Sequence, residues 1–257
     1  MRQRKKSKNA WRRWGTYNMI KNQSNLHLNG RKKNILIVAA HPDDEIIGCG
    51  ATASLYSQKG HHVYSLILGE GVTSRYDKRQ EAPGKLLSKL RKEALSANKS
   101  AGVKEVFFGG FPDNRFDKVQ LLDLVKVVEQ VKQKIKPDIV FVHHPHDRNI
   151  DHRLAHEAAL IAFRPLPNEK ARLVLAFEVA GSMKETDGKP GPFAPNYFVD
   201  ISKTINQKTK CLRAYRSEMR KYPHPRSLEG LKILAQARGL QVGKKFAEAF
   251  QLVRLVD

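Results

Sequence analysis

The feature that most limits what this chain can fold into is a regular alternation of short apolar runs with helix-forming segments, which begins at residue 34. The first run, residues 34–40 (NILIVAA), is continuously apolar and is followed by Pro42, the pattern of a strand buried on both faces. The same criteria predict strands at 34–40, 63–68, 106–108, 139–143, 173–177 and 197–200, and helices at 46–58, 86–100, 120–135, 153–163, 203–215 and 228–238. Because such alternation indicates βαβ units, we expect an α/β fold on a mostly parallel sheet.

The positive charge of the chain is concentrated at one end. The 257 residues contain 47 Lys and Arg against 25 Asp and Glu, a formal net charge of +22. Residues 1–33 hold eleven of the bases and no acid, so +11 belongs to this segment and +11 (36 bases, 25 acids) to residues 34–257. We predict a flexible basic extension over 1–33 and one folded domain over 34–257. Three interpretations of the extension stay open: a solvated tail, a contact with nucleic acid or an anionic membrane, or a translation start at Met19.

Two further observations concern the compartment. No run approaches the roughly 18 apolar residues that a membrane span needs. Cys49 and Cys211 are the only cysteines, too few for a disulfide framework. The sequence therefore favours a cytoplasmic protein in a reducing environment.

A group of titratable residues, His41-Pro42-Asp43-Asp44-Glu45, follows the first predicted strand directly. Ligand-binding residues of α/β proteins gather at the carboxyl ends of such strands. His41 and Asp44 are three residues apart, so both can reach one cation where the loop turns into a helix, and imidazole with carboxylate suits zinc. Asp43 is then available as a general base. A metal site is favoured here, and a merely polar turn is the alternative.

A second histidine-rich segment follows the predicted strand at 139–143. Half of the ten histidines lie in it: His143, His144, His146, His152 and His156. Two such segments, each after a buried strand, converge at one edge of a parallel sheet. His152, beside Asp151 at the start of a predicted helix, is the best candidate for a third metal ligand, while His156 equally fits the layer around the ligands.

Four short motifs resemble those of a known family: AHPDDE at 40–45, LGEG at 68–71, FPDN at 111–114 and DHR at 151–153. Together they resemble the PIG-L/LmbE-like zinc-dependent N-acetylglucosaminyl deacetylases, from about residue 34 to the carboxyl end. The resemblance implies a Rossmann-like three-layer fold, which agrees with the alternation of strands and helices. It also implies a hydrolase that removes the acetyl group from an N-acetylated amino sugar or sugar conjugate.

Carried over by position, the resemblance implies that His41, Asp44 and His152 hold a Zn²⁺ ion. Three protein ligands leave a position for water, whose pKa zinc lowers towards about 7. Asp43 is then the general base that takes the proton of this water and returns it to the leaving amine.

Two positions depart from the family pattern. The resemblance points to Arg91 and Asp113 as substrate-binding residues, but Arg91 lies one residue closer to the following glutamate than the family arginine does. Several members carry a histidine three residues before the last zinc ligand, and this chain has Asn149 there. Because an amide cannot shuttle a proton, we expect Asp43 to act as both base and acid, with a nearby histidine as the alternative.

Other functions stay open at this level. The charge admits a basic nucleic-acid-binding protein with a structural metal site, although no binding motif accompanies it. A metal-dependent phosphoesterase is a second alternative, although a two-metal site usually recruits more carboxylates. Residues 48–53 (GCGATA) match a dinucleotide-binding pattern, but they lie eight residues beyond the strand, and close helix packing explains them better.

The expected partner is a small N-acetyl sugar or an anionic sugar conjugate, because the domain itself carries +11 (36 bases, 25 acids). We expect no nucleic-acid partner for it. Two other partners are considered: an anionic membrane, contacted peripherally by the extension, and a second copy of the chain in a homo-oligomer.

Overall fold

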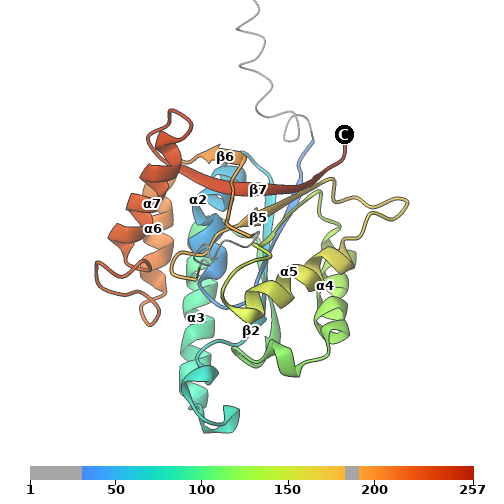
Figure 1. Cartoon of the computed structure of the whole chain (residues 1–257), viewed down its shortest axis with the longest axis vertical. Coiled ribbons are helices and arrows are strands. Elements are labelled where there is room, and N and C mark those ends of the chain that lie inside the picture. The colour runs from blue at the N-terminus through green and yellow to red at the C-terminus, as the bar shows by residue number, and fades with distance from the viewer. Residues whose placement is uncertain (1–30, 183–190) are drawn as a thin grey trace, which may run out of the picture. The chain divides into compact units, whose positions relative to one another are not determined.

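The computed structural model describes residues 31–182 and 191–257. The chain divides into two units, Met1–Lys32 and Lys33–Asp257, and the fold described below is that of the second unit (Figure 1). Our expectations for residues 1–30, including the translation start, fall outside the described residues. Within the described part, none of the helices combines the length and the apolar character of a membrane span.

The described residues form a seven-stranded sheet with the strand order β3-β2-β1-β4-β5-β7-β6. Its strands are β1 (Asn34–Ala39), β2 (His62–Gly69), β3 (Glu105–Phe111), β4 (Ile139–His143), β5 (Leu173–Phe177), β6 (Tyr197–Asp200) and β7 (Ala247–Leu255). Strands β1 to β5 are parallel, and β7 runs antiparallel to its neighbours β5 and β6. The predicted α/β, Rossmann-like architecture with a mostly parallel sheet is confirmed.

Helices cover both faces of the sheet. They are α2 (Asp44–Gln58), α3 (Gly84–Ala101), α4 (Leu121–Ile135), α5 (Ile150–Ala162), α6 (Ile205–Ala214) and α7 (Leu228–Leu240). Short 3₁₀ turns are η3 (Thr73–Arg75), η4 (Arg79–Glu81) and η5 (Phe116–Lys118). Helices α4 and α5 pack against each other on one face, and α2, α3 and α6 pack together on the other (Figure 1).

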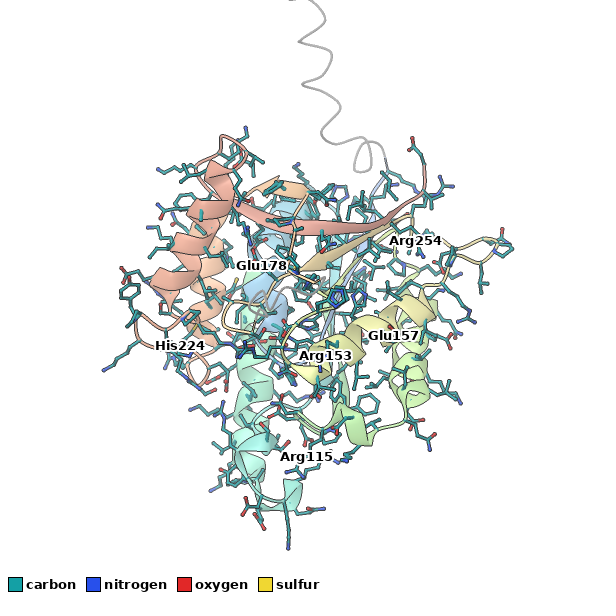
Figure 2. The ribbon with its side chains drawn as sticks, in the orientation of Figure 1. Arg115, Arg153, Glu157, Glu178, His224 and Arg254 are labelled. Carbon is teal, nitrogen blue, oxygen red and sulfur yellow. The ribbon has the colours of Figure 1, made fainter. Side chains whose placement is uncertain are left out.

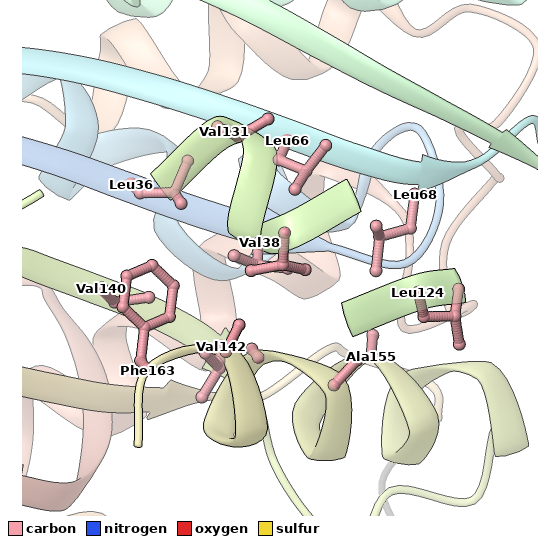
Figure 3. Close-up of a cluster of buried hydrophobic side chains, with 14 of the residues drawn as sticks. Leu36, Val38, Leu66, Leu68, Leu124, Val131, Val140, Val142, Ala155 and Phe163 are labelled. Carbon is pink, nitrogen blue, oxygen red and sulfur yellow. The ribbon is translucent and has the colours of Figure 1, made fainter. Parts of the chain in front are cut away.

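The core beneath α4 and α5 follows the two-residue period of the strands. Alternate strand residues meet these helices: Leu36, Val38, Leu66, Leu68, Val140 and Val142 (Figure 3). The opposite face of β1, with Ile35 and Ile37, is equally buried, at 1% exposed each. Because both faces are covered, the strand sequences are continuously apolar rather than alternating.

Gly48 lets α2 approach the sheet closely. A Cβ atom at this position would lie 2.3 Å from Cδ2 of Phe177, at the end of β5. The glycine is therefore needed for packing of the helix, which supports the packing interpretation of the GCGATA segment.

The helices that carry the motifs begin earlier than predicted. Helix α2 begins at Asp44 rather than 46, and α5 begins at Ile150 rather than 153. Asp44, Glu45 and Asp151 therefore occupy first helical turns, where free backbone N–H groups favour negative charge. Strand β7 was not predicted, because its sequence does not separate a buried from an exposed face: the charged Glu248 is buried, whereas the apolar Leu252, Val253 and Leu255 are exposed.

Candidate metal centre and active site

The predicted site residues lie at the carboxyl edge of the sheet. His41 follows β1, Asp44 opens α2, Asp113 follows β3, and Asp151 and His152 open α5 beyond β4. The carboxyl ends of parallel strands meet at one edge, so residues 110 apart in the chain, such as His41 and Asp151, come into contact there.

Three of these side chains form a candidate metal site. Ligand atoms of His41, Asp44 and His152 all lie within 4.8 Å of one another. Asp44 Oδ2 is 3.4 Å from His41 Nδ1 and 3.2 Å from His152 Nε2. Among the described residues, Asp44 Oδ1 is buried without a hydrogen-bond partner, and neither ring nitrogen of His152 makes a hydrogen bond of good geometry with the carboxylate beside it. Buried polar atoms of this kind need a partner, and a zinc ion fits two imidazoles and a carboxylate.

Two further carboxylates hold the histidine rings. Asp151 Oδ2 lies 2.9 Å from His41 Nε2, and Asp147 Oδ2 lies 3.0 Å from His152 Nδ1. Ser182 donates from its hydroxyl to the same oxygen of Asp147 at 2.8 Å. Carboxylates that bind the outer nitrogen of a metal-binding histidine fix its tautomer and orientation. Sequence reasoning gave neither aspartate this role, although both lie among the histidines of their segment.

A second cluster, His41 with Asp113 and Asp151, also has ligand atoms within 4.8 Å of one another. It shares His41 with the first cluster, and its carboxylates already accept hydrogen bonds. Phe116 N donates to Asp151 Oδ1 at 2.9 Å, and the Ser74 hydroxyl donates to Asp113 Oδ2 at 2.6 Å. This set therefore fits an outer layer that orients His41 better than it fits a second metal.

Asp43, the predicted general base, lies beside the candidate ligands but is held separately. It is 1% exposed, and its backbone has φ 107° and ψ −30°. Arg226 donates from Nη1 to Asp43 Oδ2 at 3.2 Å, across 183 residues of sequence. Arg226 belongs to the loop before α7, in which Figure 2 labels the nearby His224. No sequence motif marked this arginine.

The buried charges of the cluster shift one another's pKa values. Burial alone would lower the pKa of His41, but its contacts with Asp151 and Asp44 raise it to about 10. Burial would raise the pKa of Asp44, yet the neighbouring His152 holds it well below its usual range. For Asp43, burial raises the pKa well above its ordinary value, against the opposing charge of Arg226.

The two predicted substrate-binding residues differ in position. Asp113 lies in the site, with Oδ1 3.3 Å from His41 Nε2. Arg91 lies on the exposed side of α3, where its guanidinium carbon is 3.9 Å from the ring centroid of Phe108. The structure therefore brings Asp113, but not Arg91, to the cluster. This agrees with the sequence, in which Arg91 lies one residue closer to the following glutamate than the family arginine does.

Asn149, which replaces the family histidine, has a structural role. Its Oδ1 accepts a hydrogen bond from the N–H of Asp151 at 2.8 Å and so caps α5. Its amide nitrogen donates to Asn114 Oδ1 at 2.8 Å. Both ends of the amide are therefore engaged in contacts that hold the start of α5.

The remaining histidines of the second segment serve the frame of the site. Ala40 N donates to His143 Nε2 at 2.8 Å, and the His143 ring stacks on His152 with centroids 4.0 Å apart. His156 Nδ1 lies 2.7 Å from the carbonyl oxygen of His143. His144 is buried against the Gly191 carbonyl at 2.9 Å. The two histidines considered as substitutes for the absent family histidine were His144 and His146. His146 is exposed, with its ring centroid 5.6 Å from that of His144, so neither residue is among the candidate metal ligands.

Comparison with known proteins identifies the family. A family model described as GlcNAc-PI de-N-acetylase (PIG-L) matches residues 36–163, which include the three candidate ligands and Asp43. The "uncharacterized deacetylase YaiS" of Escherichia coli (strain K12) is 30% identical over 144 residues, 53% of this chain and 71% of that protein. This chain belongs to the PIG-L family. The resemblance seen in the AHPDDE and DHR motifs is confirmed, and the chain is an N-deacetylase by family.

Other relatives extend the similarity over most of the chain. Diacetylchitobiose deacetylase of Thermococcus kodakarensis is 27% identical over 226 residues, 86% of this chain and 83% of the relative. The solved structure of N,N'-diacetylchitobiose deacetylase from Pyrococcus horikoshii, in complex with its inhibitor MPG, has a TM-score of 0.69 at 21% identity. That likeness covers 94% of this chain and 92% of the other, so the PIG-L fold continues beyond residue 163 to the later strands.

Proposed function

We propose that this PIG-L protein is a zinc-dependent hydrolase that removes the acetyl group from an amino sugar of the N-acetylglucosamine type or from its conjugate. The observation that carries the proposal is the buried carboxylate of Asp43 beside a convergent set of two histidines and one aspartate. The family description and the relative named as a diacetylchitobiose deacetylase support the substrate class. They also speak against the nucleic-acid-binding and phosphoesterase alternatives.

His41, Asp44 and His152 would hold the ion, because their ligand atoms converge and the buried Oδ1 of Asp44 has no hydrogen-bond partner. When bound, zinc supplies a Lewis acid that polarises the acetyl carbonyl and makes an attacking water more acidic. Asp147 and Asp151 keep the two imidazole rings in the ligating orientation. Zinc is proposed over other divalent ions because of this mixed imidazole and carboxylate set.

The proton transfers fall to Asp43. Its carboxylate takes a proton from the water that attacks the acetyl carbon, and it returns that proton to the nitrogen as the C–N bond breaks. The products are acetate and a free amine. Arg226 holds Oδ2 of Asp43, which leaves Oδ1 for the proton. One carboxylate acts as both base and acid, because the amide of Asn149 is occupied at both ends.

The proposed substrate contacts are Asp113 and Arg91. The carboxylate of Asp113 can accept a hydrogen bond from a sugar hydroxyl next to the metal site. Arg91 would reach only a part of a substrate that extends over α3, because its guanidinium lies over Phe108. The domain charge of +11 (36 bases, 25 acids) makes anionic conjugates the first substrates to test.

The partner and compartment expectations stay predictions. Cys49 and Cys211 are both free thiols, in keeping with a reducing, cytoplasmic location. Two further predictions are that residues 1–33 contact an anionic membrane and that the protein forms a homo-oligomer.

Mass spectrometry of the reaction products tests the proposal directly. The zinc-loaded protein is incubated with N,N'-diacetylchitobiose and with phosphate-bearing N-acetylglucosamine conjugates. We expect at least one substrate to lose its acetyl group and release acetate, with activity lost on chelation and restored by Zn²⁺. A zinc-loaded protein that leaves every N-acetyl sugar intact would contradict the proposal.

A further inference from the structure

Asp43 has a backbone conformation that is costly for any residue other than glycine. Its φ of 107° lies in the positive region, where a side chain meets its own backbone. The carbonyl oxygen of Asp43 accepts hydrogen bonds from Ile46 N at 3.1 Å and Ile47 N at 2.9 Å, in the first turn of α2. On its other side, the N–H of Asp43 donates to Glu45 Oε2 at 3.1 Å. Helix α2 therefore holds one side of this residue, and the Glu45 side chain holds the other.

Glu45 is fully buried and is surrounded by donors. It is 0% exposed, and its Oε1 accepts hydrogen bonds from the Tyr215 hydroxyl and from Asn98 Nδ2, the latter at 2.8 Å. With the N–H of Asp43 at Oε2, three donors converge on one carboxylate. Two of the three, the backbone N–H and the Asn98 amide nitrogen, can act only as donors. This position therefore requires an acceptor at both of its oxygens.

The donors are themselves fixed from distant parts of the fold. Asn98, on α3, accepts a hydrogen bond at Oδ1 from Ser65 of β2 at 2.7 Å and donates to the carbonyl of Ala94 at 2.9 Å. Tyr215, directly after α6, is 0% exposed. Neither side chain has freedom to turn away from Glu45. The network thus connects β2, α3 and α6 to the turn that carries Asp43.

We propose that Glu45 and Tyr215 are positioning residues for deacetylation: Glu45 fixes the backbone of Asp43, and Tyr215 fixes Glu45. The inference rests on the proposed function, in which Asp43 carries the proton. Neither residue touches the candidate ligand atoms, so their loss should change how well the base is placed rather than whether metal binds. A misplacement of a reacting group by about 1 Å can cost 100-fold in rate.

The decisive variant is Glu45→Gln, which keeps the shape of the side chain. Its amide nitrogen must face either the N–H of Asp43 or the amide of Asn98, so a donor meets a donor in either orientation. We expect kcat to fall by about 10- to 100-fold, with KM and zinc content per chain unchanged. Glu45→Asp would keep the carboxylate but shorten the side chain, so it would lose contacts through its length. Glu45→Gln keeps the length and changes only the hydrogen-bonding groups, so it is the more informative change.

Tyr215→Phe removes one donor and leaves the carboxylate in place. We expect a kcat loss of about 10-fold, again without a change in KM or zinc content. The matched control is Tyr56→Phe, since Tyr56 is also a buried tyrosine, at 3% exposed, but contacts His61 and Phe141 instead of Glu45. In the double variant Glu45→Gln/Tyr215→Phe, the kcat loss should be smaller than the product of the two single losses, because the Tyr215 hydroxyl and the Glu45 carboxylate both contact the backbone N–H of Asp43 and contact each other.

Each result bears on the inference separately from the proposed function. If the wild type removes acetyl groups and Asp43→Ala does not, but Glu45→Gln and Tyr215→Phe keep wild-type kcat, this inference is overturned and the function stands. Multiplicative losses in the double variant would also overturn it. If Glu45→Gln does not fold, Tyr215→Phe tests the inference alone: a lower kcat at full zinc content supports it, and wild-type kcat overturns it. If the wild type deacetylates nothing, the function fails and the inference falls with it.

Discussion

At the scale of the residue, the chemistry of this site depends on how the carboxylate of Asp43 is held. The side chain is buried, its backbone has a positive φ, and it forms an ion pair with Arg226 at 3.2 Å. A buried carboxylate that loses its cationic partner is left uncompensated. The arginine therefore matters to the base in a way that the motif around Asp43 does not reveal.

Replacing Arg226 with Gln should lower kcat by about 10- to 100-fold, because the carboxylate of Asp43 loses its orienting donor. Arg226→Lys should recover part of the loss, since it keeps the charge without the planar guanidinium. Steady-state kinetics with zinc analysis measure both. The matched control is Arg220→Gln, an exposed arginine that donates to the carbonyls of Ser217 and Met219. Wild-type kcat in Arg226→Gln would contradict the role of this ion pair.

The sequence predicted the part of the site that is local in the chain. The spacing of His41 and Asp44 and the DHR motif were enough to select side chains that the fold brings together. Arg226 and Tyr215 were not predicted, because each reaches the site from a part of the chain more than 150 residues away. Such contacts depend on how α6 and α7 pack against the rest of the fold, and local sequence patterns do not predict this packing.

At the scale of the element, the fit between α2 and the sheet depends on Gly48. A Cβ there would lie 2.3 Å from Phe177, so Gly48→Ala should destabilise the protein by about 1–3 kcal/mol through overpacking. Gly84→Ala is the control, because nothing lies within 4 Å of a Cβ at that position. Chemical denaturation compares the two free energies of unfolding. Equal stability of the two variants would contradict the packing role of Gly48.

A second element-scale contact gives stability that depends on pH. Lys132 of α4 donates to Glu169, in the segment before β5. Burial alone would raise the pKa of Glu169, but the bonds from Lys132 and from the N–H of Ala171 lower it. A folded-state pKa below the unfolded value means that the contact stabilises above the unfolded pKa, and that this stability is lost as pH falls through the folded pKa.

Lys132→Met should therefore lower the free energy of unfolding by roughly 1 kcal/mol at neutral pH and by less in acid. Denaturation curves between neutral pH and about pH 3 show this as a smaller pH dependence in the variant. Lys134→Met, which removes an exposed pair with Glu105, is the control. If wild type and Lys132→Met lose stability in parallel on acidification, the linkage to Glu169 is wrong.

Element boundaries show where local pattern was sufficient. Buried parallel strands such as β1 and β4 were predicted closely, because covered strands are continuously apolar. The start of α2 was placed two residues late, because its first turn is made of the acidic motif residues Asp44 and Glu45. Strand β7 was missed, because a buried glutamate and exposed apolar residues blur its pattern and its pairing is with strands distant in sequence.

At the scale of the whole molecule, the charge of +22 divides equally between residues 1–33, with eleven bases and no acid, and residues 34–257. The half carried by residues 34–257 (36 bases, 25 acids) lies within the unit Lys33–Asp257, which holds the candidate site. A net positive domain should attract anionic substrates, and salt screens this attraction, with a Debye length of about 8 Å at physiological ionic strength.

The value of kcat/KM for a phosphate-bearing N-acetylglucosamine conjugate should therefore fall several-fold as salt rises from about 0.01 to 0.5 M. For neutral N,N'-diacetylchitobiose it should stay nearly constant. A chain without residues 1–33 should keep the same difference, because +11 (36 bases, 25 acids) remains in the domain. Loss of the difference in the shortened chain would assign the effect to the extension instead.

The central claim is that Asp43 moves the proton while His41, Asp44 and His152 hold the metal. The most direct measurement is deacetylase turnover and zinc content of Asp43→Ala and His41→Ala beside the wild type. The account predicts that Asp43→Ala retains zinc but loses turnover by about 100-fold or more, whereas His41→Ala loses both. Wild-type turnover in zinc-loaded Asp43→Ala, on a sugar that the wild type deacetylates, would contradict it.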